Sequence, residues 1–272
     1  YFGDIPAGPT LERIPAGPVQ DRQTTRATMS DKVPQPRIYR AWSVAPYGDA
    51  DLDRLQLVAQ VLGGSKSSRL DRRLVHEEKL VDKVSAFVYP FELASTFYIT
   101  ADVRQGVDPA KVEKIIDEEL RRLVAEGPTA AELEQAQVMT RASFVRGVER
   151  IGGFGGKADA LAECAVYSGD PGCFRDSLEV VAQATPAALK AAGGKWLGAG
   201  SHTLLVQPGE RTVLEEESSP TPAPFALPAA DAKFTTVKSD VDRSKGVPMP
   251  ENFPELKFPA LERATLSNGT QV

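Results

Sequence analysis

The stretch KVSAFVYPFELASTFYITADV, residues 83–103, holds two segments of strand character on either side of a short connection. Aromatic and β-branched residues, which favour strands, recur through residues 83–89 and 95–103. Segments joined so closely along the chain pair in opposite directions, because parallel pairing needs a crossover of about a dozen residues or more. The stretch therefore predicts two neighbouring antiparallel strands.

The segments around this pair show strand and helix patterns in an irregular order. Further strands are expected at residues 23–29, 37–45 and 202–207. Helices are expected at residues 52–62, 67–74, 108–127, 129–144, 157–167, 173–182 and 185–196. The strict strand–helix–strand alternation of a parallel sheet is missing. The sequence therefore predicts an α+β fold in which an antiparallel sheet is covered by helices.

Capping signals support three of the expected helices. Asp49 or Asp51 suits the N-cap of the first one. Asp108 is followed by a proline, which is favoured at the first helical position. Thr129 and Glu132 have the spacing of a capping box, in which each side chain bonds to the backbone of the other residue.

Proline marks the expected boundaries, because it removes a backbone donor and fixes φ, and most prolines lie outside the middle of the chain. We expect a linker from a preceding domain at residues 1–22, one folded domain at 23–209, an extended inter-domain linker at 210–260 and the start of the next domain at 261–272. Asn268-Gly269 is typical of a hairpin turn, so more chain is expected to follow it. The chain begins at Tyr1 rather than Met, which leaves room for a removed targeting segment.

Composition and charge exclude two classes of partner. The net charge of −5 argues against nucleic acid, because a phosphate-binding surface needs a basic stripe and none stands out. No apolar run approaches the roughly 20 residues that a membrane helix needs. We therefore expect no nucleic-acid partner and no membrane partner.

The chain lacks the residues of a complete catalytic site. Its two histidines, His76 and His202, are far apart in sequence, whereas a zinc peptidase motif places two histidines on one helix face. Ser67, Ser68 and Cys164 lack the sequence context of an activated nucleophile. We expect no catalytic residue, no metal ligand and no cofactor in this chain.

Cys164 and Cys173 bracket a short stretch that contains glycine and proline. They are either two unrelated small buried residues or the ends of a disulfide that closes a loop of about ten residues. The spacing does not decide between these interpretations. A disulfide would imply an oxidising compartment, so the periplasm is favoured over the cytoplasm, although the compartment itself is unknown.

Two motifs carry a family resemblance. Residues 62–70 read LGGSKSSRL, and residues 75–80 read VHEEKL. In this order and spacing they resemble the second-domain signature of pitrilysin/insulinase-type zinc peptidases, a family that includes the mitochondrial processing peptidases. The resemblance extends over roughly residues 23–209, and residues 259–272 are similar to the opening of the family's next domain.

The resemblance implies homologous α+β domains that form the two halves of a clamshell around a peptide chamber. In that family an earlier domain holds zinc through an HxxEH motif and a downstream Glu, and this motif is absent here. We expect a chamber-forming, substrate-contacting domain of a bacterial zinc metallopeptidase, inactive alone, whose zinc site lies outside the chain. The alternative is a catalytically inactive homologue that acts as a scaffold for a peptide or a partner. Expected partners are a peptide substrate and other domains of the same polypeptide or a partner subunit.

The family's second domain often supplies an Arg and, seven residues later, a Tyr that hold the substrate backbone near the metal. In the register set by residues 77–79, these two places fall at Val75 and Asp82. Either the register is off by one, or nearby residues compensate, or this branch has lost the pair, which would lower turnover by a factor of about 10²–10³. The candidate substrate-binding residues are Arg69, Arg72, Arg73 and Tyr89.

Overall fold

The computed structural model describes residues 8, 10, 17–19, 23–198, 200–211, 240, 242, 244, 246, 252, 255, 257 and 260–271. The chain divides into two compact units, Tyr1–Glu215 and Glu216–Val272. The helices and strands named below lie in the first unit. Most of the two expected linkers, at 1–22 and 210–260, lies outside the described residues, so these boundaries stay predictions.

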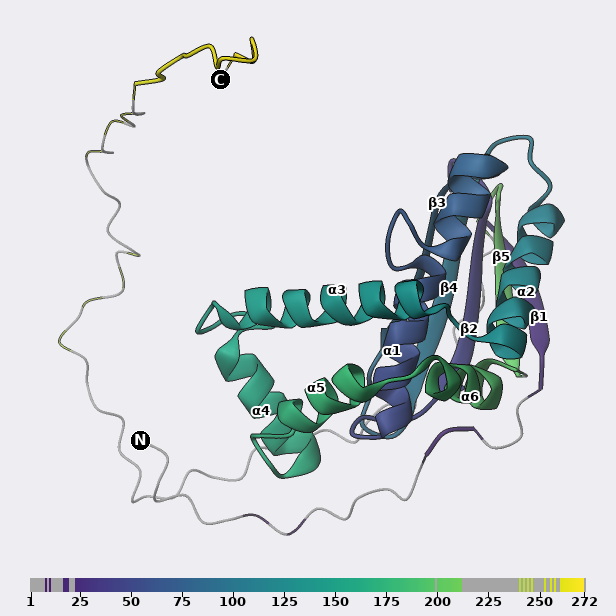
Figure 1. Ribbon diagram of the computed structural model, residues 1–272, viewed down its shortest axis with the longest axis horizontal. Helices are drawn as coiled ribbons and strands as arrows, with labels where there is room; N and C mark the ends of the chain where they lie inside the picture. The colour runs from purple at the N-terminus through teal and green to yellow at the C-terminus, as the bar shows by residue number, and fades with distance from the viewer. Residues whose placement is uncertain are drawn as a thin grey trace. The chain divides into compact units, whose positions relative to one another are not determined.

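The first unit contains a five-stranded sheet in the order β1-β5-β2-β4-β3 (Figure 1). Its strands are β1 (Thr25–Asp31), β2 (Arg37–Val44), β3 (Val81–Tyr89), β4 (Ser95–Val103) and β5 (Ser201–Pro208). Neighbouring strands are antiparallel except β1 and β5, which are parallel, with Thr25 opposite His202. The α+β class is confirmed, but the sheet is mixed rather than wholly antiparallel. Because β1 and β2 run in opposite directions and β5 lies between them, β5 can be antiparallel to only one of the two.

The β3–β4 hairpin confirms the expectation drawn from residues 83–103. The two strands are antiparallel, with Phe87 opposite Tyr98. Along β4, buried residues alternate with half-buried ones from Ser95 to Val103. This alternation shows that helices cover one face of the sheet, while the other face stays partly open to solvent.

The described residues form seven helices that accompany the sheet. They are α1 (Ala50–Gly63), η1 (Asp71–Glu77), α2 (Pro109–Glu126), α3 (Ala130–Val148), α4 (Lys157–Ser168), α5 (Phe174–Gln183) and α6 (Pro186–Leu197). Helix α1 contacts β3 and β4, α6 contacts β2, and α2 contacts β4 and α6. Helices α3, α4 and α5 contact one another, and α3 leads away from the sheet (Figure 1); we call these three helices the arm.

The helix starts follow the capping signals of the sequence. The Asp49 side chain accepts a hydrogen bond from the Asp51 backbone at the start of α1. Asp108 does the same for the Ala110 backbone, with Pro109 at the first helical position of α2. Thr129 forms the complete capping box of α3, and such a cap stabilises a helix by about 1 kcal/mol.

One expected helix has a different geometry. The segment expected as a helix over residues 67–74 becomes the π-helix η1, in which the Glu78 backbone amide donates to the Arg73 carbonyl, five residues earlier, at 2.9 Å. The wider turn is followed by Lys79, a non-glycine residue with φ +54°. Such a residue in the left-handed region costs about 1 kcal/mol, and it turns the chain from η1 into β3.

The main hydrophobic core lies between the sheet and the helices. Trp42 of β2 and Phe97 of β4 meet edge to face, with ring centres 5.8 Å apart. Leu55 and Leu62 of α1 are fully buried among them. Each buried side chain of this size contributes about 1.5–3 kcal/mol to the hydrophobic free energy of folding.

In the second unit the structure describes a short turn. Thr265 and Gln271 form an isolated antiparallel bridge, and the Leu266 amide donates to the Thr270 carbonyl at 2.8 Å. Gly269 has φ +84°, a conformation that glycine adopts without strain. The geometry agrees with a hairpin turn at Asn268-Gly269, while the beginning of another domain there stays a prediction. None of the helices formed by the described residues is long and apolar enough to cross a bilayer.

Candidate functional site

Arg69 is buried, with only 3% of its side chain exposed. Its Nε and Nη2 atoms donate to the two carboxylate oxygens of Glu132 at 2.8 Å and 2.7 Å, and Nη2 also donates to the Gly127 carbonyl at 3.0 Å. The arginine holds the pKa of Glu132 at about 2. Arg69 therefore ties the start of η1 to the α2–α3 connection, and its guanidinium is not presented to a peptide.

Arg73 is engaged by three carboxylates. Its guanidinium lies 3.1 Å from Glu78, 2.5 Å from Glu118 and 3.2 Å from Glu119. Burial alone would lower the pKa of Arg73, but the hydrogen bonds with these carboxylates raise it overall. A peptide carboxylate would have to displace these partners, so the surroundings of Arg73 favour a structural role.

Arg72 and Tyr89 are the two accessible members of the candidate set. Arg72 is 57% exposed, and its Nε lies 3.9 Å from Glu77, which is a loose surface pair. Tyr89, at the end of β3, is 53% exposed. The sequence placed the two residues in one segment, and the structure places them on different elements, η1 and β3.

Tyr89 belongs to a group of four rings, which we call the aromatic cluster. Its ring centre lies 5.1 Å from that of Phe87, 5.7 Å from that of Tyr98 and 6.5 Å from that of Phe91. Phe87 and Tyr98 stack across the β3–β4 pair at 5.5 Å. Tyr98 occupies one of the half-buried positions of β4, so the cluster lies on the sheet face that the helices leave partly open.

Val75 and Asp82 occupy the two positions at which the family often has an Arg and a Tyr. Val75 is partly buried and packs against the hydrophobic core. The Asp82 carboxylate accepts hydrogen bonds from Arg104 at 2.9 Å and from Gln35 at 3.2 Å. An apolar residue and a carboxylate cannot donate hydrogen bonds to a substrate carbonyl as an Arg and a Tyr do.

The residues present do not fit the zinc ion of the family. His76 Nε2 lies 3.1 Å from Asp71 Oδ1, and His202 Nδ1 lies 2.8 Å from the Thr25 hydroxyl. Neither histidine has a second imidazole beside it. Within the described part of the chain, no group of three or more His, Cys, Asp or Glu side chains is placed to hold a metal ion.

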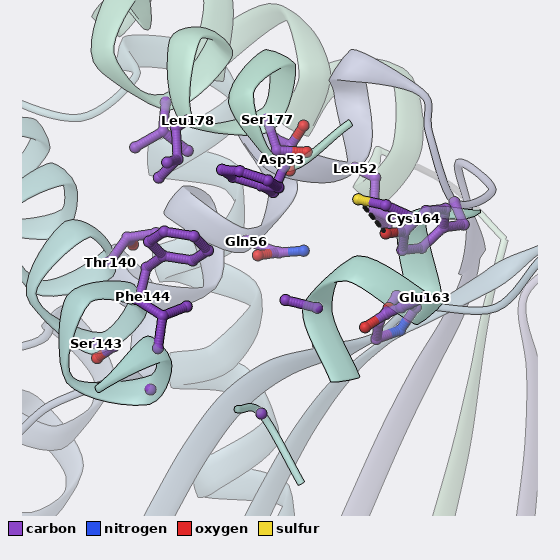
Figure 2. A pocket seen from close by; sticks show the side chains of 18 of the residues that line it. Leu52, Asp53, Gln56, Thr140, Ser143, Phe144, Glu163, Cys164, Ser177 and Leu178 are labelled. Carbon is purple, nitrogen blue, oxygen red and sulfur yellow. Dashed lines mark hydrogen bonds between the residues drawn. The ribbon is translucent and has the colours of Figure 1, made fainter. Parts of the chain in front are cut away.

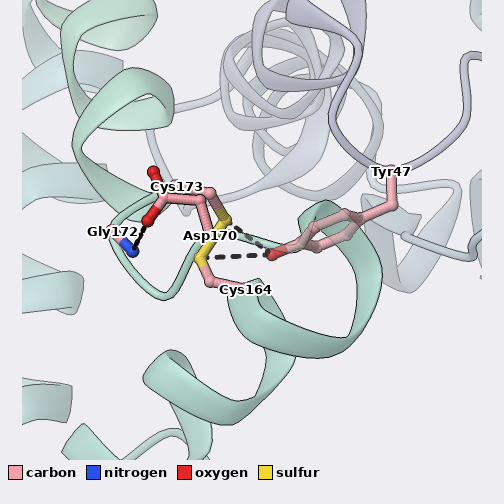
Figure 3. The surroundings of a disulfide bond; sticks show 5 residues. All are labelled: Tyr47, Cys164, Asp170, Gly172 and Cys173. Atoms are coloured by element: carbon pink, nitrogen blue, oxygen red, sulfur yellow. Dashed lines mark hydrogen bonds between the residues drawn. A yellow bond between two sulfur atoms is a disulfide. The ribbon is translucent and has the colours of Figure 1, made fainter.

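The structure joins Cys164 and Cys173 by a disulfide, with their Cα atoms 5.4 Å apart. The bond links α4 to the start of α5. Figure 3 shows the Tyr47 ring reaching across to this bond, with its hydroxyl 3.8 Å and 3.6 Å from the two sulfur atoms. The disulfide thus closes the connection between α4 and α5, and the Tyr47 hydroxyl places the bond beside the residues that precede α1.

Two features were missed by reasoning from sequence. The first is the aromatic cluster, of which only Tyr89 was singled out; the signal for it was the recurrence of aromatic residues in the two strand segments 83–89 and 95–103, which the structure pairs with Phe87 opposite Tyr98. The second is a cavity between α1 and the arm that includes Asp53 and Glu163. No local signal identifies those two acids, because they come from helices α1 and α4, far apart in the chain.

Comparisons with known proteins agree with this fold. A family model described as the peptidase M16 inactive domain matches residues 1–139. A protease from Helicobacter pylori shares 21% identity over 75% of this chain and 48% of its own, with a TM-score of 0.64. A peptidase M16 inactive domain from Pseudomonas fluorescens shares 20% identity over 77% of this chain and 48% of its own, with a TM-score of 0.62.

A third solved structure, an inactive peptidase domain from Bordetella parapertussis, shares 22% identity over 70% of this chain and 96% of its own, with a TM-score of 0.57. At these identities the three structures show the fold alone. The chain spans about half the length of the first two. No curated protein matches it.

The family model covers slightly more than half of the 272 residues, and the resemblance seen in residues 62–80 is thereby confirmed. The chain belongs to the peptidase M16 inactive-domain family.

Proposed function

We propose that this chain forms part of the wall of a peptide chamber in a bacterial zinc metallopeptidase and contacts the substrate there. The zinc site lies outside the chain, in another domain of the same polypeptide or in a partner subunit. Membership of an inactive-domain family supports this assignment, as does the lack of a ligand set among the described residues.

The observation that carries the proposal is the aromatic cluster on the open face of the sheet. Tyr89 and Phe91 are both more than half exposed, although each contacts another ring of the cluster. Exposed aromatic side chains gathered in one place are typical of surfaces that bind other chains. Arg72, on η1, is a second accessible candidate for substrate contact, whereas Arg69 and Arg73 bond to carboxylates of α2 and α3 and support the fold.

The test compares single variants in the assembled protein that includes the zinc-binding domain. Tyr89→Ala and Arg72→Ala should raise KM for peptide cleavage about 5- to 30-fold, which corresponds to a loss of 1–2 kcal/mol of substrate binding. Arg121→Ala, which removes an exposed arginine from α2, is the matched control and should leave KM unchanged. Equal KM values in all three folded variants would refute the proposed contact surface.

The departure at Val75 and Asp82 favours a second candidate function, a peptide-binding scaffold without turnover. An assembled, zinc-loaded protein that binds a peptide but does not cleave it would support the scaffold. In that case Tyr89→Ala should still weaken peptide binding, measured by fluorescence anisotropy. Cleavage by the assembled protein would exclude the scaffold.

The disulfide supports an oxidising compartment, and we propose the periplasm rather than the cytoplasm. Thiol titration of protein taken directly from fractionated cells should find Cys164 and Cys173 oxidised and the chain in the periplasmic fraction.

A further inference from the structure

A cavity of about 300 Å³ lies between α1 and the three helices of the arm. Asp53 and Gln56 reach it from α1, Phe144 from α3 and Glu163 from α4. Figure 2 shows Phe144 and Glu163 on opposite sides of the Gln56 amide. Ligand pockets measure about 300–1,000 Å³, so this one lies at the lower end of the range and has room for a single side chain.

The charged residues of the lining are all acidic. Asp53, Asp159 and Glu163 all face the cavity. Arg54, the neighbour of Asp53 in the chain, pairs instead with Asp51 at 2.8 Å. In the described part of the chain, the ion pairs formed by lysines and arginines do not include any of the three cavity carboxylates.

Burial makes two of these carboxylates, Asp53 and Glu163, costly to charge. It raises the pKa of Asp53 to about 6, against the opposing effect of a hydrogen bond with Ser177. Burial also raises the pKa of Glu163, to which the nearby charge of Asp159 adds. Both shifts would be reversed by a cation placed in the cavity, because an opposite charge favours the ionised form.

Two aromatic rings, Phe144 and Phe174, belong to the apolar part of the lining. Phe144 and Phe174 stack with ring centres 5.7 Å apart. The Arg175 guanidinium lies 5.6 Å from the Phe174 ring centre, within the range at which a cation and a ring face attract each other. Aromatic walls with carboxylates beyond them suit a group that has an alkyl stem and a positively charged head.

We propose that this cavity binds the side chain of a lysine or arginine residue carried by a peptide. The alkyl stem packs against Phe144 and Phe174, and the charged head pairs with Asp53 and Glu163.

A peptide fits better than a free amine because the cavity continues into a surface groove. The groove shares Tyr47, Asp159 and Glu163 with the cavity and is also lined by Phe91 and Tyr167. Phe91 also belongs to the aromatic cluster, in which it contacts Tyr89, so a peptide bound in the groove would extend toward that cluster. The inference goes beyond the proposed function, because binding at the cavity requires neither zinc nor cleavage.

The test is calorimetric titration of the full 272-residue chain at neutral pH with a short peptide that has one central lysine. Two matched ligands are the same peptide with norleucine in place of lysine, and free 1,5-diaminopentane. The lysine peptide should bind about tenfold more tightly than either, because it alone combines the charge with a backbone for the groove. Equal binding of the norleucine peptide would overturn the charge assignment, and equal binding of the diamine would overturn the peptide assignment.

Variants of the chain locate the site. Asp53→Asn and Glu163→Gln should each weaken lysine-peptide binding about tenfold, whereas Glu134→Gln, which removes an exposed charge from α3, should not. Asp53→Asn keeps the shape of the side chain and removes a charge that burial disfavours, so the variant should fold. Unchanged binding by both cavity variants would refute the site. Tyr89→Ala separates this inference from the proposed function. In this variant the ratio of lysine-peptide to norleucine-peptide affinity should stay at about tenfold.

Discussion

Arg69 forms an ion pair with Glu132 that stabilises the fold, although the sequence made it a candidate substrate-binding residue. Arg69 follows a glycine- and serine-rich stretch, which is where an exposed basic residue is expected. In the structure its guanidinium lies against the start of α3 and donates to the Glu132 carboxylate, which also caps that helix. Sequence alone cannot separate substrate binding from a structural ion pair, because the role of Arg69 depends on whether a helix distant in the sequence covers its side chain.

We expect Glu132→Gln to destabilise the fold by about 3 kcal/mol, because it leaves the buried Arg69 charge without its partner. The pKa of Glu132 is lowered in the folded state to about 2, so its contribution is fully present above the ordinary value of 4.5 and is lost as the pH falls toward 2. Urea unfolding of wild type and variant at neutral pH and near pH 2 measures both effects.

The matched control is Glu134→Gln, two residues along the same helix and exposed. It should change the free energy of unfolding by no more than about 0.5 kcal/mol. A Glu132→Gln variant as stable as this control would show that the pair does not hold η1 to α3.

At the level of elements, the local signals predicted most of the helices and strands. Asp108, Thr129 and Thr185 begin helices where the sequence placed them, because capping depends on residues a few positions apart. The geometry of η1 and the parallel pairing of β1 were not predictable in this way. Both depend on contacts with segments that are distant in the chain, and the same is true of the cavity acids Asp53 and Glu163.

The disulfide links two elements of the arm, and its removal should loosen them. We expect the double substitution of Cys164 and Cys173 by serine to lower the free energy of unfolding by about 2–3 kcal/mol, the value for a closed loop of about ten residues. Thermal unfolding of the oxidised, reduced and substituted chains provides the measurement. Titration of the unfolded, unreduced protein should detect no free thiol, and two reactive thiols would contradict the bond.

At the level of the whole molecule, the expected domain boundaries yield a further prediction. Residues 210–260 are rich in proline and lack apolar periodicity, so limited proteolysis should cut there before it cuts inside the packed helices α2 and α3. Mass spectrometry of the first fragments identifies the sites. Early cleavage within residues 108–144 would contradict this order.

The position of β5 in the sheet has a consequence for how the chain is synthesised. Thr25 of β1 and His202 of β5 are neighbours in space but 177 residues apart in sequence. At a synthesis rate of about 5–20 residues per second, β1 waits on the order of ten seconds or more for its partner strand to leave the ribosome. During that time β2 also lacks one neighbour, and unpaired strand edges invite association with other chains. A nascent chain that ends before residue 201 is therefore a natural client for a chaperone, and the sheet can be completed only when translation of the domain is almost finished.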